Sequence, residues 1–132
     1  MIYGNFFSKD SQFFKYRMTT SKVVLLGDKC SKIPAIINRA TTTFFDSEDP
    51  GITSGAAYVI KPIQLQENTV NLHIWDLACQ ERYLPIIPKY VCHSAVVIFV
   101  FSLTDRDSLF NVTRYYDVVK QNSKEFPILF LV

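Results

Sequence analysis

Long hydrophobic runs are absent from this chain. The longest apolar segment, residues 95–101, has the length of a strand, whereas a membrane-spanning helix needs about 20 apolar residues. Position 2 is Ile2 and not the glycine that N-myristoylation requires, the first residues lack the pattern of a secretory signal, and no cysteine stands near the C-terminus to be prenylated. We therefore expect a cytoplasmic protein without an anchor of its own.

Cysteine is scarce, and neither sign of charge dominates. The three cysteines are widely spaced and form neither a Cys-x-x-Cys pair nor a cysteine–histidine cluster: Cys30, Cys79 and Cys92. This spacing indicates no zinc site and no disulfide framework, so a reducing compartment is the expected environment. The net charge of +2 is too small to predict nucleic-acid binding without a clustered basic face. We therefore expect no nucleic-acid partner.

The composition predicts one globular domain with an N-terminal extension. Hydrophobic residues make up 48% of the 132 residues and charged ones 20%, which suits a packed core and not a disordered chain. Residues 1–21 lack a helical or strand period and carry six aromatic residues: Tyr3, Phe6, Phe7, Phe13, Phe14 and Tyr16. We expect a flexible leader here, with an aromatic arm that docks on the domain or a partner as the alternative. The domain itself would span residues 22–132.

From residue 22 onward, apolar segments of strand length alternate with helical ones. The predicted strands are 23–26, 58–65, 70–75, 95–101 and 128–132, with a turn at 66–69 and a loop at 44–54. The predicted helices are 35–42 with Pro34 in its first turn, a short one limited by Pro85 and Pro88, and one capped by Thr104 or Asp107 whose apolar face includes Leu109, Val112, Tyr116 and Val119. This alternation predicts an α/β fold, a doubly wound and mostly parallel sheet with helices on both faces.

Several short motifs follow one another at a characteristic spacing. They are Gly27-Asp28, Ser54-Gly55-Ala56-Ala57-Tyr58, Trp75-Asp76-Leu77-Ala78-Cys79-Gln80-Glu81, Tyr90-Val91-Cys92-His93-Ser94-Ala95 and Phe99-Val100-Phe101-Ser102-Leu103-Thr104. Together, across residues 22–132, they resemble the Rab family of the Ras superfamily of small GTPases. The resemblance implies a P-loop fold without the family's last strand and helices, and GTP or GDP bound with Mg²⁺ at the carboxyl ends of the strands. It also implies protein effectors and regulators of the trafficking type, through which the protein would reach endomembranes.

The resemblance also assigns roles to individual residues. It implies that Gly27 begins the phosphate loop, and that Thr53 binds the nucleotide and Mg²⁺. It further implies that Asp76 holds Mg²⁺ through water and that Gln80, as the catalytic residue, orients the attacking water. The aromatic positions of the Rab effector surface are occupied by Tyr58, Trp75 and Tyr90. Simple packing in the core is the alternative for these three rings.

The phosphate loop departs from the family pattern Gly-x-x-x-x-Gly-Lys-Ser/Thr. At its last three positions the chain has Lys32, Ile33 and Pro34. Lys32 brings a Cβ where the backbone must approach the ligand and where a positive φ is expected. Ile33 offers neither charge nor donor. Pro34 has no N–H and no hydroxyl. Between Asp76 and Gln80, Cys79 replaces a glycine of the family pattern.

Two functions are therefore open: a Rab-like GTPase with impaired nucleotide binding, and a non-catalytic module that keeps the effector surface. A third possibility is an unrelated α/β enzyme. The sequence does not support it, because no set of residues for a nucleophilic site and no metal-binding cluster can be recognised.

Overall fold

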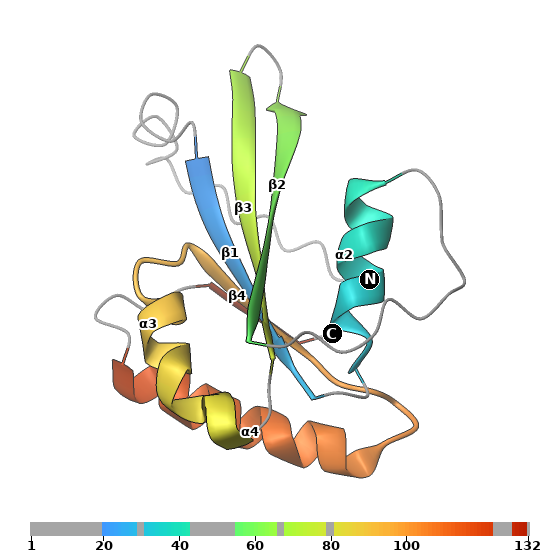
Figure 1. Ribbon diagram of the computed structural model, residues 1–132, viewed down its shortest axis with the longest axis vertical. Helices are drawn as coiled ribbons and strands as arrows, with labels where there is room; N and C mark the ends of the chain where they lie inside the picture. Colours follow the sequence, from blue (N-terminus) through green and yellow to red (C-terminus); the bar gives the residue numbers. More distant parts are fainter. Residues whose placement is uncertain are drawn as a thin grey trace, which may run out of the picture.

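A mixed β-sheet forms the centre of the molecule. The computed structural model describes residues 20–28, 31–42, 55–65, 68–78, 81–122 and 128–131 (Figure 1). Within these residues, five strands are arranged in the order β2-β3-β1-β4-β5. Their bounds are β1 Thr20–Gly27, β2 Ala56–Leu65, β3 Asn68–Ala78, β4 Val96–Val100 and β5 Ile128–Leu131. The β2–β3 pair is antiparallel and the other pairs are parallel, which confirms the predicted fold class.

Helices lie on both faces of this sheet. Their bounds are α2 Ile33–Thr41, the 3₁₀ segment η2 Glu81–Ile86, α3 Ile87–Val91 and α4 Arg106–Asn122. α2 stands on one side of the sheet, and α3 and α4 on the other (Figure 1). The helical stretch around Pro85 and Pro88 is short, as predicted, because proline removes backbone donors. No helix of the described residues is long and apolar enough to span a membrane.

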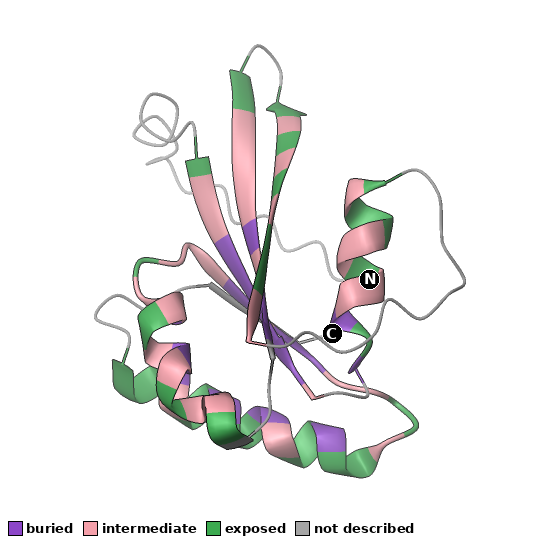
Figure 2. Ribbon diagram, viewed as in Figure 1, coloured by how far each residue is buried: buried purple, intermediate pink, exposed green. Residues whose placement is uncertain are grey.

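Strand β1 supplies side chains to the core on both faces of the sheet. Val24 and Leu26 join the cluster under α3 and α4, whereas Val23 and Leu25 join the cluster under α2. Alternation along a strand sends successive side chains to opposite faces, and a strand covered on both faces is apolar throughout. Figure 2 shows this buried band crossing the centre of the sheet. The end of β1, at Gly27, is therefore rigidly positioned.

The N-terminus of α4 differs from the prediction. The backbone N–H of Asp107 donates to Oδ1 of Asp105 at 3.0 Å, so Asp105 caps the first turn in place of Thr104 or Asp107. The core-facing residues are Ser108, Val112, Tyr115 and Val119, whereas Leu109 and Tyr116 are exposed. The buried Ser108 hydroxyl bonds the Asp105 carbonyl at 2.6 Å and the Ser102 N–H at 2.9 Å. These bonds let a polar residue face the core beside Val112 and Val119, which are buried as predicted.

The β2–β3 hairpin is longer than predicted. β3 already begins at Asn68, which pairs with Leu65, so Asn68 and Thr69 of the predicted turn at 66–69 belong to the strand. The other predicted elements match to within a few residues at their ends. Residues 1–19 of the predicted leader and the whole predicted loop at 44–54 lie outside the described residues. The domain boundary at residue 22 stays a prediction.

Candidate nucleotide site and aromatic surface

Gly27 ends β1 at a point of close backbone approach. A Cβ at this position would overlap the carbonyl oxygen of Val100 and Oγ of Ser31, and would lie 3.0 Å from Cδ1 of Ile33. Only a residue without a side chain fits between β4 and the loop that follows. Packing alone therefore explains why position 27 is a glycine, independent of any ligand.

The loop after Gly27 is tied to itself and to α4. The buried Ser31 donates its N–H to the Asp28 carbonyl at 2.9 Å, and its hydroxyl donates to the same oxygen. The side-chain amide of Asn111 in α4 donates to Oδ2 of Asp28 at 2.7 Å. These bonds hold the described part of the loop against α4.

Lys32 adopts a left-handed backbone conformation. Its φ is 55° and its ψ is 33°, and it stands at the N-cap of α2 without a side-chain capping bond. A residue with a Cβ loses roughly 1–2 kcal/mol in this region relative to the right-handed one. The position is that of the motif's second glycine, so the strain expected there from the sequence is present.

Ile33 is a core residue. Its side chain is 3% exposed and belongs to the apolar cluster beneath α2, whose buried members are Val23, Leu25, Ile33, Ile74 and Val100. The family motif has its phosphate-binding lysine at this position. Pro34 follows in the first turn of α2, where it offers no N–H. Positions 33 and 34 thus supply neither the motif's ammonium, nor its hydroxyl, nor this amide N–H.

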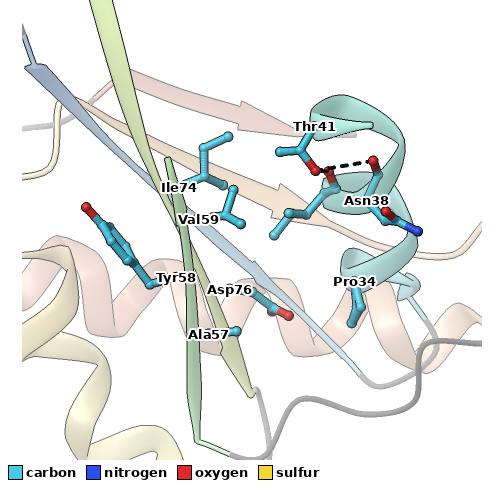
Figure 3. A pocket seen from close by; sticks show the side chains of 9 residues that line it. Pro34, Asn38, Thr41, Ala57, Tyr58, Val59, Ile74 and Asp76 are labelled. Carbon is cyan, nitrogen blue, oxygen red and sulfur yellow. Dashed lines mark hydrogen bonds between the residues drawn. The ribbon is translucent and has the colours of Figure 1, made fainter. Parts of the chain in front are cut away.

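Asp76 lies near the carboxyl end of β3, with its side chain 4% exposed. It lines a cavity of about 350 Å³ between α2 and the β2–β3 hairpin, shown in Figure 3. The other lining residues are Pro34, Ile37, Asn38, Thr41, Ala57, Tyr58, Val59 and Ile74. The Thr41 hydroxyl donates back to the Ile37 carbonyl at 2.8 Å. The cavity is mostly apolar, and Asp76 is the carboxylate in its wall.

The predicted Mg²⁺ ligands are only partly described. Asp76 has the oxygen chemistry that Mg²⁺ prefers, but Thr53, the catalytic candidate Gln80 and Cys79 lie outside the described residues. Within the described part of the chain, no group of three or more His, Cys, Asp or Glu residues could hold a metal ion. With Pro34 in place of a hydroxyl residue, the described residues do not fit Mg²⁺–GTP as the family motif binds it.

The three aromatic residues singled out from the sequence lie together on the α3 side of the sheet. The ring centroids of Tyr58 and Trp75 are 4.6 Å apart, and those of Trp75 and Tyr90 are 5.2 Å apart. Tyr58 is 43% exposed, whereas Trp75 and Tyr90 are half-buried and pack against the core. The rings support the core and also reach the surface, and their role in binding effectors stays a prediction. We call Tyr58, Trp75 and Tyr90 the aromatic surface.

Sequence reasoning missed two polar neighbours of this surface. The Tyr58 hydroxyl hydrogen-bonds to Nδ1 of His73. Nζ of Lys22 lies 6.0 Å from the centroid of the Trp75 ring and donates to the Cys92 carbonyl at 3.0 Å. Burial lowers the pKa of Lys22 below 10.5, and its interaction with Cys92 partly opposes this. Two-residue alternation along β1 and β3 was the signal that could have placed Lys22 and His73 on this face.

A model of a known protein family matches most of this chain. Residues 22–132 match the model of the Ras family. The matched region includes nearly all of the described residues, the loop after β1, Asp76 and the aromatic surface. The match is to the family as a whole, so the features specific to Rab proteins remain predictions.

Proposed function

Because the chain belongs to the Ras family, we propose that it is a Rab-type protein-binding module that does not depend on a GTPase cycle. Its aromatic surface would bind protein effectors or regulators of vesicle trafficking. Nucleotide binding would be weak, because the phosphate loop has lost the groups that hold phosphate and Mg²⁺.

The burial of Ile33 is the observation that carries this proposal. In this chain the position of the phosphate-binding lysine contributes to the core beneath α2. Charge-assisted hydrogen bonds contribute about 1.5–3 kcal/mol each, so the loss of two or three lowers affinity by roughly two to six powers of ten. Lys32 does not replace the missing ammonium, because it stands one position earlier in a strained N-cap conformation.

The composition of the aromatic surface supports a binding role. Tyrosine and tryptophan dominate the residues that contribute most to protein–protein affinity. The tilted ring contacts among Tyr58, Trp75 and Tyr90 fix the ring orientations before a partner arrives. Pre-organised rings lose little conformational entropy on binding, which favours affinity.

A GTP-dependent switch is the second candidate. The buried Asp76 near the end of β3 favours it, since this carboxylate and Thr53 would hold Mg²⁺ while Gln80 would keep its family role. The apolar Ile33 and Pro34 argue against it. Both candidates share the fold and the aromatic surface, and they differ in nucleotide affinity.

Titration with a fluorescent GTP analogue at millimolar Mg²⁺ separates the two candidates. The unmodified chain is expected to show no saturable binding in the micromolar range. A variant carrying Lys32→Gly, Ile33→Lys and Pro34→Ser restores the motif and is titrated beside it, with circular dichroism to confirm that it folds. Micromolar or tighter binding by the unmodified chain would refute the non-catalytic proposal. Loss of that binding in Asp76→Ala would then assign it to this site.

A further inference from the structure

Four elements meet around the aromatic surface and extend it with a further apolar side chain. Ile60 stands two residues after Tyr58 on β2, so both side chains lie on the same face. It is 52% exposed and pairs across the strands with His73. Lys22 from β1 and Tyr90 from α3 complete the contacts to Trp75. The result is an apolar strip made from non-local parts of the chain.

Basic residues accompany this strip. Lys22 in β1 and His73 in β3 lie beside its rings, and Lys89 and His93 stand next to Tyr90 and Cys92 in the chain. Among the described side chains of β1, β2, β3 and α3, the one carboxylate is that of Asp76, which lines the cavity between α2 and the β2–β3 hairpin. Figure 3 shows Tyr58 and Asp76 on opposite sides of the hairpin. We call these four basic residues the basic rim.

From this arrangement we propose that the aromatic surface binds an acidic amphipathic segment of a partner protein, whose apolar side chains cover the rings while its carboxylates meet the basic rim. The proposal rests on the binding role proposed above and adds the charge of the partner. Complementary charge adds specificity and raises the association rate, while the aromatic contacts supply most of the affinity.

Lys22 is the rim residue whose charge a partner would influence most. Its ammonium is partly buried beside Trp75 and held by the Cys92 carbonyl, and burial disfavours its charged form by lowering the pKa. A partner carboxylate placed above it would favour the charged form. Charge pairs in such partly desolvated positions interact more strongly than exposed pairs, which water and salt screen.

An anionic membrane is the other surface that basic and aromatic groups can meet, and the structure favours it less. Recognition of anionic lipid takes clusters of about four to eight lysines or arginines that reach the headgroups. Here the rim has two lysines, of which Lys22 is held back against Cys92. Lys61 of the adjoining β2 bonds the Ala40 carbonyl on the α2 side instead. A peptide can place single carboxylates where such a sparse rim needs them.

Fluorescence anisotropy with three labelled amphipathic peptides tests the proposal on the full chain. The peptides share one apolar stripe of leucine and phenylalanine and carry glutamate, glutamine or lysine at the flanking positions. We expect the glutamate peptide to bind about tenfold or more tighter than the glutamine peptide, and the lysine peptide to bind weakest. The difference should shrink as NaCl rises from about 50 mM to about 500 mM, because salt screens exposed charge.

Rim variants show where the charge preference arises. Lys22→Met and Lys89→Gln should each reduce the preference for glutamate over glutamine severalfold. Arg39→Gln is the matched control, because Arg39 is exposed on α2 across the sheet. Lys89→Gln keeps the test valid if Lys22→Met perturbs folding.

The possible results distinguish failure of the acidic-partner proposal from failure of the proposed binding role. Equal binding of the glutamate and glutamine peptides, with loss of both in Tyr58→Ala, would overturn the acidic partner and leave the binding role standing. Absence of binding by any peptide, or binding that Tyr58→Ala does not weaken, would count against the binding role as well. Binding to phosphatidylserine vesicles that surpasses binding to all peptides would replace the peptide partner with a membrane.

Discussion

The rings of Tyr58 and His73 lie 5.5 Å apart on neighbouring strands, and the Tyr58 hydroxyl bonds Nδ1 of His73. Together with Trp75 on its other side, this contact holds the exposed tyrosine ring in one orientation. The pair therefore joins the edge strand β2 to the rest of the aromatic surface. It also shows that His73, although it borders the proposed binding surface, has a structural role.

Removing only the hydroxyl should separate these two roles. Tyr58→Phe keeps the ring stacked on Trp75 and loses the bond to His73, so we expect a stability loss of at most about 1 kcal/mol, smaller than that of Tyr58→Ala. Binding of the acidic peptide should persist in Tyr58→Phe and fail in Tyr58→Ala. Urea unfolding and anisotropy measure the two effects. Equal binding losses in both variants would mean that the hydroxyl, and not the ring, contacts the partner.

Gly27 and Gly55 form a matched pair for testing close packing against backbone strain. Gly27→Ala would place its Cβ onto the Val100 carbonyl, which belongs to β4 and cannot rotate away. Gly55 has φ +89° and open space where a Cβ would stand, so alanine there adds strain alone, about 1–2 kcal/mol. We expect Gly27→Ala to destabilise by about 2–3 kcal/mol or more in urea unfolding. A loss at Gly27 below that at Gly55 would contradict the packing argument.

Lys32→Gly should stabilise the protein. Glycine relieves the left-handed strain of about 1–2 kcal/mol but loses roughly 0.5–1 kcal/mol to the greater freedom of the unfolded chain. The net gain expected from these two effects is about 0.5–1 kcal/mol in urea unfolding. Arg39→Gly in the interior of α2 is the control and should cost about 1 kcal/mol. A destabilising Lys32→Gly would show that this residue is held by contacts beyond its backbone geometry.

The sequence was sufficient for the fold because central strands covered on both faces are apolar throughout. β1 and β4 were recognisable for that reason, and the prolines limited the helical segment before β4. The core-facing side of α4 was harder to predict, since the burial of Ser108 depends on bonds to Ser102 and Asp105 that no hydrophobic pattern encodes. The end of the β2–β3 hairpin was missed because Asn68 belongs to a residue type more common in turns than in strands.

The candidate site was only partly predictable. The positive φ of Lys32 followed from the glycine that the motif has there, and the grouping of the aromatic rings followed from family spacing. The burial of Ile33 did not, because it depends on packing against Val23 and Val100 from other strands. The roles of Thr53 and Gln80 stay predictions, since both residues lie outside the described part of the chain.

Returning the motif lysine should damage the core. Ile33→Lys places an ammonium in an apolar cluster, where an unpaired charge is strongly unfavourable, so we expect a loss of about 3 kcal/mol or more. Ile33→Val, which keeps the apolar character, should cost only about 0.5–1.5 kcal/mol. Chemical denaturation compares the two. An Ile33→Lys protein as stable as the parent, with new nucleotide binding, would show that this side chain leaves the core easily and would weaken the proposed function.

The lowered pKa of Lys22 predicts a pH-dependent stability difference. With a folded-state pKa below the ordinary 10.5, the unfolded chain binds more protons between the two values, so folding stability rises with pH across that window. Below the folded pKa the unfavourable contribution of the charged lysine is fully present. We therefore expect the stability of the parent relative to Lys22→Met to increase between pH 7 and about pH 10, as measured by urea unfolding at each pH. The comparison cancels the titration of groups that do not interact with Lys22. A parent that instead loses stability relative to Lys22→Met as the pH rises would mean that the charged lysine is net favoured in the fold, through the Cys92 carbonyl and Trp75, and that burial is not the dominant effect.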